Sequence, residues 1–229
     1  MIGNFRYIFF DADDTLWQNE EHFREAERKF AQRLAGFAPM DETIRTITEK
    51  QERNIPVFGY GSKTFFIGML DAAAEICGEH FCPAIYSDIK QIITELAYHE
   101  FDLVEGVEEV LEALSERYTL VVATKGDLIE QRTKYIRSGL DRFFSHVEVM
   151  PHKDETDYRE MAAKFGLAPE EILMVGNAVK SDIVPVINIG GTAVHIPYKV
   201  TWAHEIMEMP QSERIYELKS IKNLPELLL

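Results

Sequence analysis

An acidic pair at the end of an apolar run is the first feature that could do chemistry. Residues 7–10 read Tyr-Ile-Phe-Phe, and Asp11, Asp13 and Thr15 follow them. A short apolar run predicts a buried strand, and open α/β sheets place their ligands at the carboxyl ends of strands. Two carboxylates at such a place require a cation or a shared proton. We therefore expect a metal-dependent site with one nucleophilic and one proton-transferring carboxylate. An acidic turn after a strand is the alternative.

Polar residues also follow three later apolar runs. They are Thr124 and Lys125 after residues 120–123, Lys153 after 147–150, and Gly176-Asn177 after 172–175, with Asp182 further on. Each has an ordinary structural role as an alternative: helix capping for Thr124, a surface charge for Lys153 and a helix start for Asn177.

The same residue types also suit a phosphate and a cation. Thr124 can hydrogen-bond an anion, and the amides after it open a helix N-terminus that suits phosphate. Lys153 can neutralise a nucleophilic carboxylate and an incoming phosphate together. Asn177 and Asp182 offer the hard oxygen ligands that Mg²⁺ prefers.

The elements that must position these residues form an α/β core. Strands are predicted at 7–10, 120–123, 147–150, 172–175 and 193–196, and helices near 106–117, 127–138, 155–165 and 180–189. Unbroken apolar strands interleaved with helices predict a parallel sheet covered on both faces. Residues 214–218 predict an edge strand, and a short helix follows Ser220. We expect residues 1–17 and 103–229 to form this Rossmann-like core.

Residues 18–102 form a helical block. Candidate helices lie near 19–36, 41–53, 62–77 and 84–100, with breaks at Pro39, at 56–61 and at 78–83. Because the block follows the first strand, it predicts a separate all-helical domain beside the carboxyl ends of the strands. We expect a lid that excludes water and selects the substrate. A passive insertion is the alternative.

Composition narrows the class of partner. The chain has 229 residues and a formal net charge of −15, which disfavours nucleic acid and anionic membranes. No apolar run approaches the roughly 20 residues of a membrane span, and no basic-then-apolar leader is present, so we expect a cytoplasmic protein. Cys77, His80 and Cys82 fall short of a four-ligand metal site. They predict a helix C-terminus at Gly78 with two reduced thiols.

Taken together, the four polar segments resemble the haloacid-dehalogenase-like hydrolase superfamily. Its first motif resembles Asp11-x-Asp13-x-Thr15, its second Thr124, its third Lys153, and its fourth Gly176-Asn177 with Ser181-Asp182. The resemblance covers the whole chain, because block 18–102 is similar to the helical cap of the dehalogenase, phosphoglucomutase and nucleotidase branches.

The resemblance implies a Mg²⁺-dependent hydrolase of phosphate monoesters. Asp11 would attack phosphorus to form an aspartyl-phosphate, and Asp13 would protonate the leaving oxygen and then activate water. The implied Mg²⁺ ligands are an Asp11 side-chain oxygen, the Asp13 carbonyl and Asn177. Asp182 would hold a metal-bound water or support these ligands. The implied phosphate ligands are Thr124, the Lys125 amide and the Lys153 ammonium.

Three positions depart from the superfamily pattern. Asp14 stands where many members have Gly, and we expect it to be a harmless surface residue. Lys125 stands where Asn is common, so its side chain either adds charge near the substrate or points outward. Asn177 stands where Asp is more usual, which predicts weaker Mg²⁺ binding.

Several functions remain open within the fold. A sugar-phosphate mutase keeps both acids, whereas a dehalogenase attacks carbon and has no use for the acid Asp13. A non-catalytic binding protein that retains the fold is the alternative from another class. Among phosphatases of small phosphorylated metabolites, residues 9–17 resemble nucleotidase-type members. A monomer and a homodimer are both compatible with the sequence.

Overall fold

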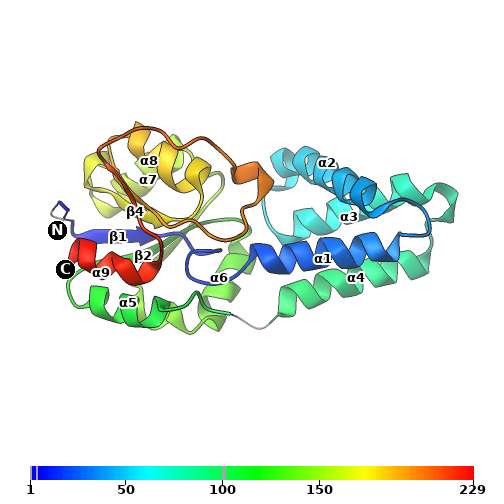
Figure 1. Cartoon of the computed structure of the whole chain (residues 1–229), viewed down its shortest axis with the longest axis horizontal. Coiled ribbons are helices and arrows are strands. Elements are labelled where there is room, and N and C mark those ends of the chain that lie inside the picture. The colour runs from blue at the N-terminus through cyan, green and yellow to red at the C-terminus, as the bar shows by residue number, and fades with distance from the viewer. Residues whose placement is uncertain (1, 4, 100–101) are drawn as a thin grey trace. The chain divides into compact units, whose positions relative to one another are not determined.

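The apolar run of residues 7–10 is the central strand of a parallel sheet. The computed structural model describes residues 2–3, 5–99 and 102–229, and β1 (Tyr7–Phe10) pairs with a strand on each side (Figure 1). The other strands are β2 (Thr119–Lys125), β3 (His146–Met150), β4 (Leu173–Gly176), β5 (Thr192–His195) and β6 (Ile215–Glu217). All pairings are parallel, in the order β3-β2-β1-β4-β5-β6. The predicted edge strand at 214–218 is β6.

Helices cover both faces of this sheet, as the continuous apolar strands predict. Helices α5 (Val107–Ser115) and α9 (Leu224–Leu228) lie on one face, and α7 (Glu155–Phe165) and α8 (Val184–Asn188) lie on the other (Figure 1). Successive side chains of β1 point to opposite faces of the sheet. Ile8 and Phe10 pack in the apolar core with α5 and α9, and Phe9 packs in the core with α7 and α8. The predicted α/β fold class is confirmed.

Strand β1 occupies the switch point of the sheet. It lies between β2 and β4, and ligands of open α/β sheets bind outside the carboxyl ends of the strands at such a point. Helix α6 (Leu128–Arg137) follows β2, and a π-helical turn (Val179–Ile183) precedes α8 where an ordinary helix start was predicted. Short 3₁₀ turns cover 140–143, 169–171, 203–205 and 221–223.

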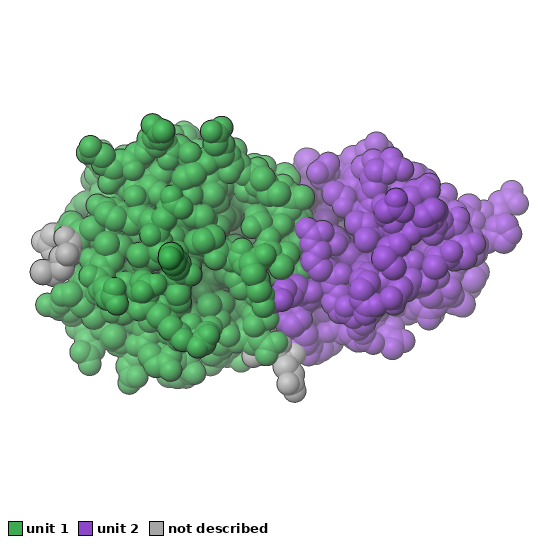
Figure 2. Space-filling view, viewed as in Figure 1, with its two compact units in different colours: residues 1–20, 101–229 green, residues 21–100 purple. Residues whose placement is uncertain are grey.

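The chain divides into two compact units, which Figure 2 distinguishes by colour. One contains residues 1–20 and 101–229, and the other contains residues 21–100. The first boundary between the units follows residue 20, where the sequence predicted residue 17. The second follows residue 100, where the sequence predicted residue 102. In the described part of the chain, no helix has the length and apolar character that a membrane crossing needs.

The second unit is a bundle of helices around its own core. Its helices are α1 (Glu20–Arg33), α2 (Met40–Phe58), α3 (Ser62–Cys77) and α4 (Pro83–Tyr98), with a 3₁₀ turn at 78–80. Phe30, Phe65 and Met69 are fully buried in its apolar cluster. Residue 100, the last of the predicted fourth helix, lies outside the described residues.

Two helix ends in this unit test the sequence predictions. The break predicted over 56–61 lies there but is shorter, because α2 passes through Pro56 and ends at Phe58, with Gly59 as its C-cap at φ 78°. Glycine adopts this conformation without steric cost. The predicted helix C-terminus at Gly78 is confirmed, since α3 ends at Cys77 and Gly78 has φ 52°.

The expectation that Asp14 is a harmless surface residue is wrong. Asp14 is buried with φ 65°, a conformation that glycine adopts freely and that Asp tolerates better than most residues. Its carboxylate accepts hydrogen bonds from the amides of Asn19 (2.8 Å) and Glu20 (3.1 Å). Burial raises the pKa of Asp14 to about 7, against these hydrogen bonds. The side chain therefore caps the first turn of α1.

Candidate active site

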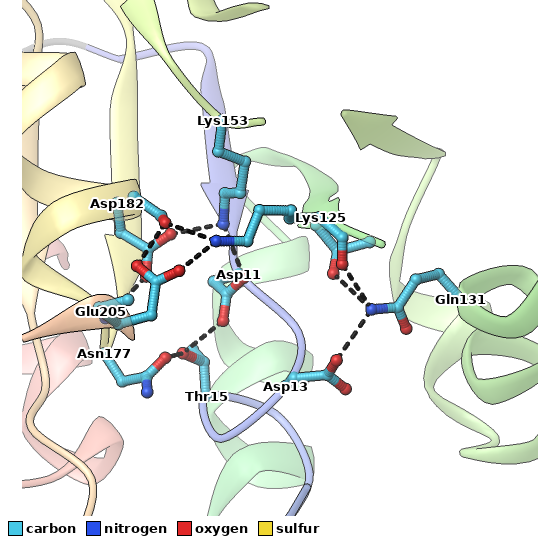
Figure 3. A network of polar contacts seen from close by, with 12 residues as sticks. Asp11, Asp13, Thr15, Lys125, Gln131, Lys153, Asn177, Asp182 and Glu205 are labelled. Atoms are coloured by element: carbon cyan, nitrogen blue, oxygen red, sulfur yellow. Dashed lines mark hydrogen bonds and ion pairs between the residues drawn. The ribbon is translucent and has the colours of Figure 1, made fainter. Parts of the chain in front are cut away.

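A buried lysine joins two of the predicted acids (Figure 3). Lys153 Nζ donates to Asp11 Oδ1 at 2.6 Å and to Asp182 Oδ1 at 2.5 Å. Burial alone would lower the pKa of Lys153, but the two carboxylates outweigh burial and raise it well above its ordinary value. Lys153 is therefore an ammonium ion that fixes one oxygen of Asp11.

The second oxygen of Asp11 faces a different set of groups. Thr15 Oγ1 donates to Asp11 Oδ2 at 3.2 Å, and the Asp11 amide continues the β1–β4 pairing by bonding the Val175 carbonyl at 2.9 Å. Burial and the neighbouring Asp182 raise the pKa of Asp11 to about 7, although Lys153 opposes them. The site around Asp11 thus holds more negative charge than one lysine neutralises.

Three oxygen-bearing groups converge beside Asp11 Oδ2. With its amide nitrogen turned inward, Asn177 donates to Asp11 Oδ2 at 3.2 Å, to the Asp13 carbonyl at 3.3 Å and to Thr15 Oγ1 at 3.1 Å. In the opposite orientation of the amide group, Asn177 Oδ1 occupies this position and accepts a hydrogen bond from Thr15 Oγ1. Adjacent ligands of an octahedral Mg²⁺ with bonds of 2.0–2.1 Å lie about 3 Å apart. The donor set therefore fits a small hard cation.

Asp182 lies behind Lys153 and not among these oxygens. Its Oδ1 bonds Lys153, and its Oδ2 accepts from the Ala178 amide at 2.8 Å. Both oxygens of Asp182 are therefore engaged, one by Lys153 and one by the backbone. A Cβ on Gly176 would lie 2.2 Å from Asp182 Oδ2, which explains why glycine precedes Asn177.

At the end of β2, the Lys125 side chain reaches the π-helical turn and the 203–205 turn (Figure 3). Its ammonium pairs with Glu205 and donates to Ser181 Oγ at 3.0 Å. Burial opposes the ionisation of Glu205, but Lys125 and the Ser181 hydroxyl outweigh it, so the pKa of Glu205 is lowered. Sequence reasoning missed Glu205, because it lies on a 3₁₀ turn far along the chain and carries no motif.

Asp13 is held by a separate group of donors. Trp17 Nε1 donates to its Oδ1 at 2.7 Å, Gln131 Nε2 donates to its Oδ2 at 2.8 Å, and Lys134 Nζ lies 3.0 and 3.2 Å from the two oxygens. Burial opposes ionisation, but these donors outweigh it and lower the pKa of Asp13. Sequence reasoning missed Gln131 and Lys134, whose spacing on a helix gives no signal of what they face.

The structure brings the predicted residues into one network. Asp11, Lys153 and Asp182 are in direct contact, and the Asn177 amide reaches Asp11. Thr124 and Asp13 are linked by one atom, since Gln131 Nε2 donates to Thr124 Oγ1 at 3.2 Å as well as to Asp13. A lysine-paired carboxylate, an oxygen cluster that suits a cation and a hydrogen-bonded second acid therefore share one edge of the sheet.

Comparison with known proteins agrees with this arrangement. The family model of the haloacid dehalogenase-like hydrolases matches residues 5–190. The chain belongs to this family. A haloacid dehalogenase-like family hydrolase from Xanthomonas campestris is 30% identical, with a TM-score of 0.89 over 98% of this chain and 90% of that one. The resemblance drawn from the four motifs is confirmed.

Curated relatives of the chain have the name glyceraldehyde 3-phosphate phosphatase. The protein of Methanothermobacter thermautotrophicus is 27% identical over 96% of this chain and 98% of its own length. That of Pyrococcus furiosus is 30% identical, but the match spans only 58% of each protein. A 2-haloacid dehalogenase from Pseudomonas syringae, 20% identical with a TM-score of 0.64 over 98% of each chain, shares the fold alone.

The contact between Gly176 and Asp182 gives a test of the support for Lys153. Gly176→Ala places a methyl group against the Asp182 carboxylate, so we expect a loss of about 1–3 kcal/mol in the free energy of unfolding, as in overpacked cores. Urea unfolding measures this loss. Gly36→Ala is the matched control, because a Cβ there meets nothing within 4 Å. Equal stabilities of the two variants would contradict the close contact.

Proposed function

We propose that the protein is a Mg²⁺-dependent phosphomonoester hydrolase that works through an aspartyl-phosphate on Asp11. The observation that carries the proposal is the division of the Asp11 carboxylate, with Oδ1 held by the Lys153 ammonium and Oδ2 directed at the Asn177 amide. One oxygen is thereby fixed by a cation of the protein, and the other faces a cluster that suits a metal. Membership of the hydrolase family supports this proposal.

The charges of the site favour a divalent cation as a partner of the substrate. With Asp11 ionised for attack, Asp11 and Asp182 carry two negative charges and Lys153 carries one positive charge, which leaves the buried trio at −1. The pairs Lys134–Asp13 and Lys125–Glu205 are each neutral. A phosphate monoester dianion would meet a negative site, whereas a bound Mg²⁺ would make the trio positive. Charge neutralisation of this kind is what phosphoryl transfer requires.

The residues that would hold Mg²⁺ are Asp11 through Oδ2, Asp13 through its carbonyl and Asn177 through its amide oxygen. When bound, the ion would neutralise charge on the transferring phosphoryl group. Asp182 would act through Lys153, whose ammonium it fixes. Thr124, the Lys125 amide and Lys153 would bind the phosphate oxygens. In this assignment the Lys125 ammonium pairs with Glu205, and only the Lys125 amide would bind phosphate.

The reaction divides into two transfers of the phosphoryl group. A carboxylate oxygen of Asp11 attacks phosphorus, the ester P–O bond breaks, and the leaving oxygen takes a proton from Asp13. Asp13, now a carboxylate, then takes a proton from water as that water attacks phosphorus, and the bond to Asp11 breaks to release phosphate. Asp13 is ionised in the free protein, but an approaching dianion raises the pKa of a neighbouring carboxyl. Substrate binding thus prepares Asp13 for the first transfer.

The substrate class is a small phosphorylated metabolite. The names of the curated relatives make glyceraldehyde 3-phosphate the first candidate, and they give no support to the nucleotidase expectation from residues 9–17. A second acid at Asp13 has a use when an ester oxygen leaves and none when a halide leaves, which argues against a dehalogenase. The assembled network argues against a non-catalytic protein. Hydrolysis assays on triose phosphates, sugar phosphates and nucleoside monophosphates would separate these substrates.

The nucleophile is tested with p-nitrophenyl phosphate. We expect turnover that requires Mg²⁺ and that falls at least about a thousandfold in Asp11→Asn, because removal of a nucleophile abolishes the covalent route. Release of p-nitrophenol measures the rate. The control is Asp141→Asn, the same change at an exposed aspartate of the same unit. Turnover in Asp11→Asn at the wild-type rate would refute the assignment.

The metal ligand Asn177 is tested by binding and not by rate. Asn177→Asp adds a charged ligand to the cluster, so we expect Mg²⁺ to bind about tenfold more tightly or better, since ligand charge tunes such sites. Isothermal titration with MgCl₂ in the absence of substrate measures the affinity. Asn223→Asp adds the same charge away from the cluster and should leave the affinity unchanged. Equal affinities of the two variants would exclude Asn177 as a ligand.

A further inference from the structure

We propose that Lys134 and Gln131, both on α6, are positioning residues that hold Asp13 in the orientation from which it protonates the leaving group. The inference rests on the proposed function, because it concerns a step of the same reaction. It adds two residues of the chain that belong to none of the four motifs. Neither residue needs to touch the substrate, since both act through Asp13.

The carboxylate of Asp13 is held at both of its oxygens. Oδ1 receives Trp17 Nε1 and Lys134 Nζ, and Oδ2 receives Gln131 Nε2 and Lys134 Nζ. Donors from two directions fix the rotation of a carboxylate, which one hydrogen bond leaves free. The Asp13 side chain nevertheless keeps 23% of its surface exposed. It is therefore fixed in direction and still accessible to a ligand.

Lys134 has the environment of a functional lysine and not of a surface one. Its ammonium is buried, bonds Asn19 Oδ1 at 2.7 Å, and lies 3.5 Å from Glu130 as well as against Asp13. Lysines in the last turn of a helix commonly face solvent beside the helix dipole. A buried ammonium requires paired charge. Its bridging of both Asp13 oxygens supplies that pairing and fixes the second acid.

Gln131 connects the end of β2 to Asp13. Besides Asp13 Oδ2, its Nε2 donates to the Lys125 carbonyl at 2.8 Å and to Thr124 Oγ1 at 3.2 Å. Gly126 leaves room for this amide, because a Cβ there would lie 3.0 Å from Gln131 Nε2. The residues expected to bind phosphate and the residue expected to transfer protons are thus held by one side chain. Their relative positions do not depend on the substrate.

Fixed geometry matters most for poor leaving groups. A general acid must lie within about 2.6–3.2 Å of the oxygen that it protonates, and lost orientation lowers the rate. A nitrophenolate leaves as a stable anion and needs little help from an acid. A methoxyphenolate is more basic and depends on the proton. Loosening Asp13 should therefore slow the second kind of substrate selectively.

The test compares 4-nitrophenyl phosphate and 4-methoxyphenyl phosphate as substrates of the whole protein with Mg²⁺. The measured quantity is kcat/KM, which reports the first transfer to Asp11 and excludes the later hydrolysis. In Lys134→Met we expect kcat/KM on the methoxyphenyl ester to fall about tenfold or more, because a misdirected general acid loses part of its contribution to the rate. On the nitrophenyl ester we expect a clearly smaller fall.

The control variants separate positioning from general damage. Lys164→Met removes a lysine that pairs with Glu148 with 62% of its side chain exposed, and it should leave both values of kcat/KM unchanged. Lys134→Arg keeps the charge and should recover much of the selective loss. If Lys134→Met does not fold, as judged by circular dichroism, the same ratio is measured in Gln131→Ala, for which a milder selective loss is expected.

The outcomes also separate this inference from the proposed function. Equal falls of kcat/KM on the two esters, or no fall, would overturn the positioning role while wild-type turnover and its dependence on Asp11 stand. If the wild type has no turnover, or if Asp11→Asn turns over as fast as the wild type, the proposed function itself is overturned. The positioning role is then overturned with it.

Discussion

The ion pairs of Lys153 with Asp11 and Asp182 are the interaction on which the site depends. They join the end of β1, the turn after β3 and the π-helical turn after β4 through one buried ammonium. Breaking a buried ion pair by removing one partner typically costs about 3–5 kcal/mol, because a buried charge is left uncompensated. The glycine before Asn177 exists to make room for Asp182. The three motifs are therefore one structural unit as well as one chemical site.

The two acids differ because their neighbours differ. Asp11 shares one lysine with Asp182 and has a raised pKa, whereas Asp13 has Lys134, Gln131 and Trp17 and a lowered one. This order is the reverse of what a nucleophile and a general acid need in the first transfer. A cation at the Asn177 cluster would favour ionised Asp11, and a bound dianion would favour protonated Asp13. The metal and the substrate would thus set the protonation states of the two acids, while the positions of their side chains are already fixed in the protein.

The sequence was sufficient for those parts of the molecule that are local. A strand followed at once by Asp11 and Asp13 is visible in ten residues, and the same pattern recurs before Thr124, Lys153 and Asn177. Because parallel strands end at the same edge, the assembly of these residues follows from the pattern. The π-helical turn before α8 did not follow from the sequence, and neither did the passage of α2 through Pro56, which lies at an exposed position near the end of that helix.

The partners of the motif residues were not predictable in the same way. Glu205 reaches Lys125 across 80 residues of sequence, and Lys134 reaches Asp13 across 121. Polar residues on a helix or a turn are usually solvated, so their spacing carries no information about such contacts. The burial of Asp14 depends on a positive φ that sequence alone does not display.

The most direct test of the account is the location of the phosphoryl group during turnover. The protein is mixed with p-nitrophenyl phosphate and Mg²⁺, quenched in acid within the first turnover, digested and analysed by mass spectrometry. The account predicts a phosphoryl group on Asp11, present at higher occupancy in Asp13→Asn, which lacks the base for the second transfer. Turnover with no phosphoryl group on Asp11 in either protein would contradict it.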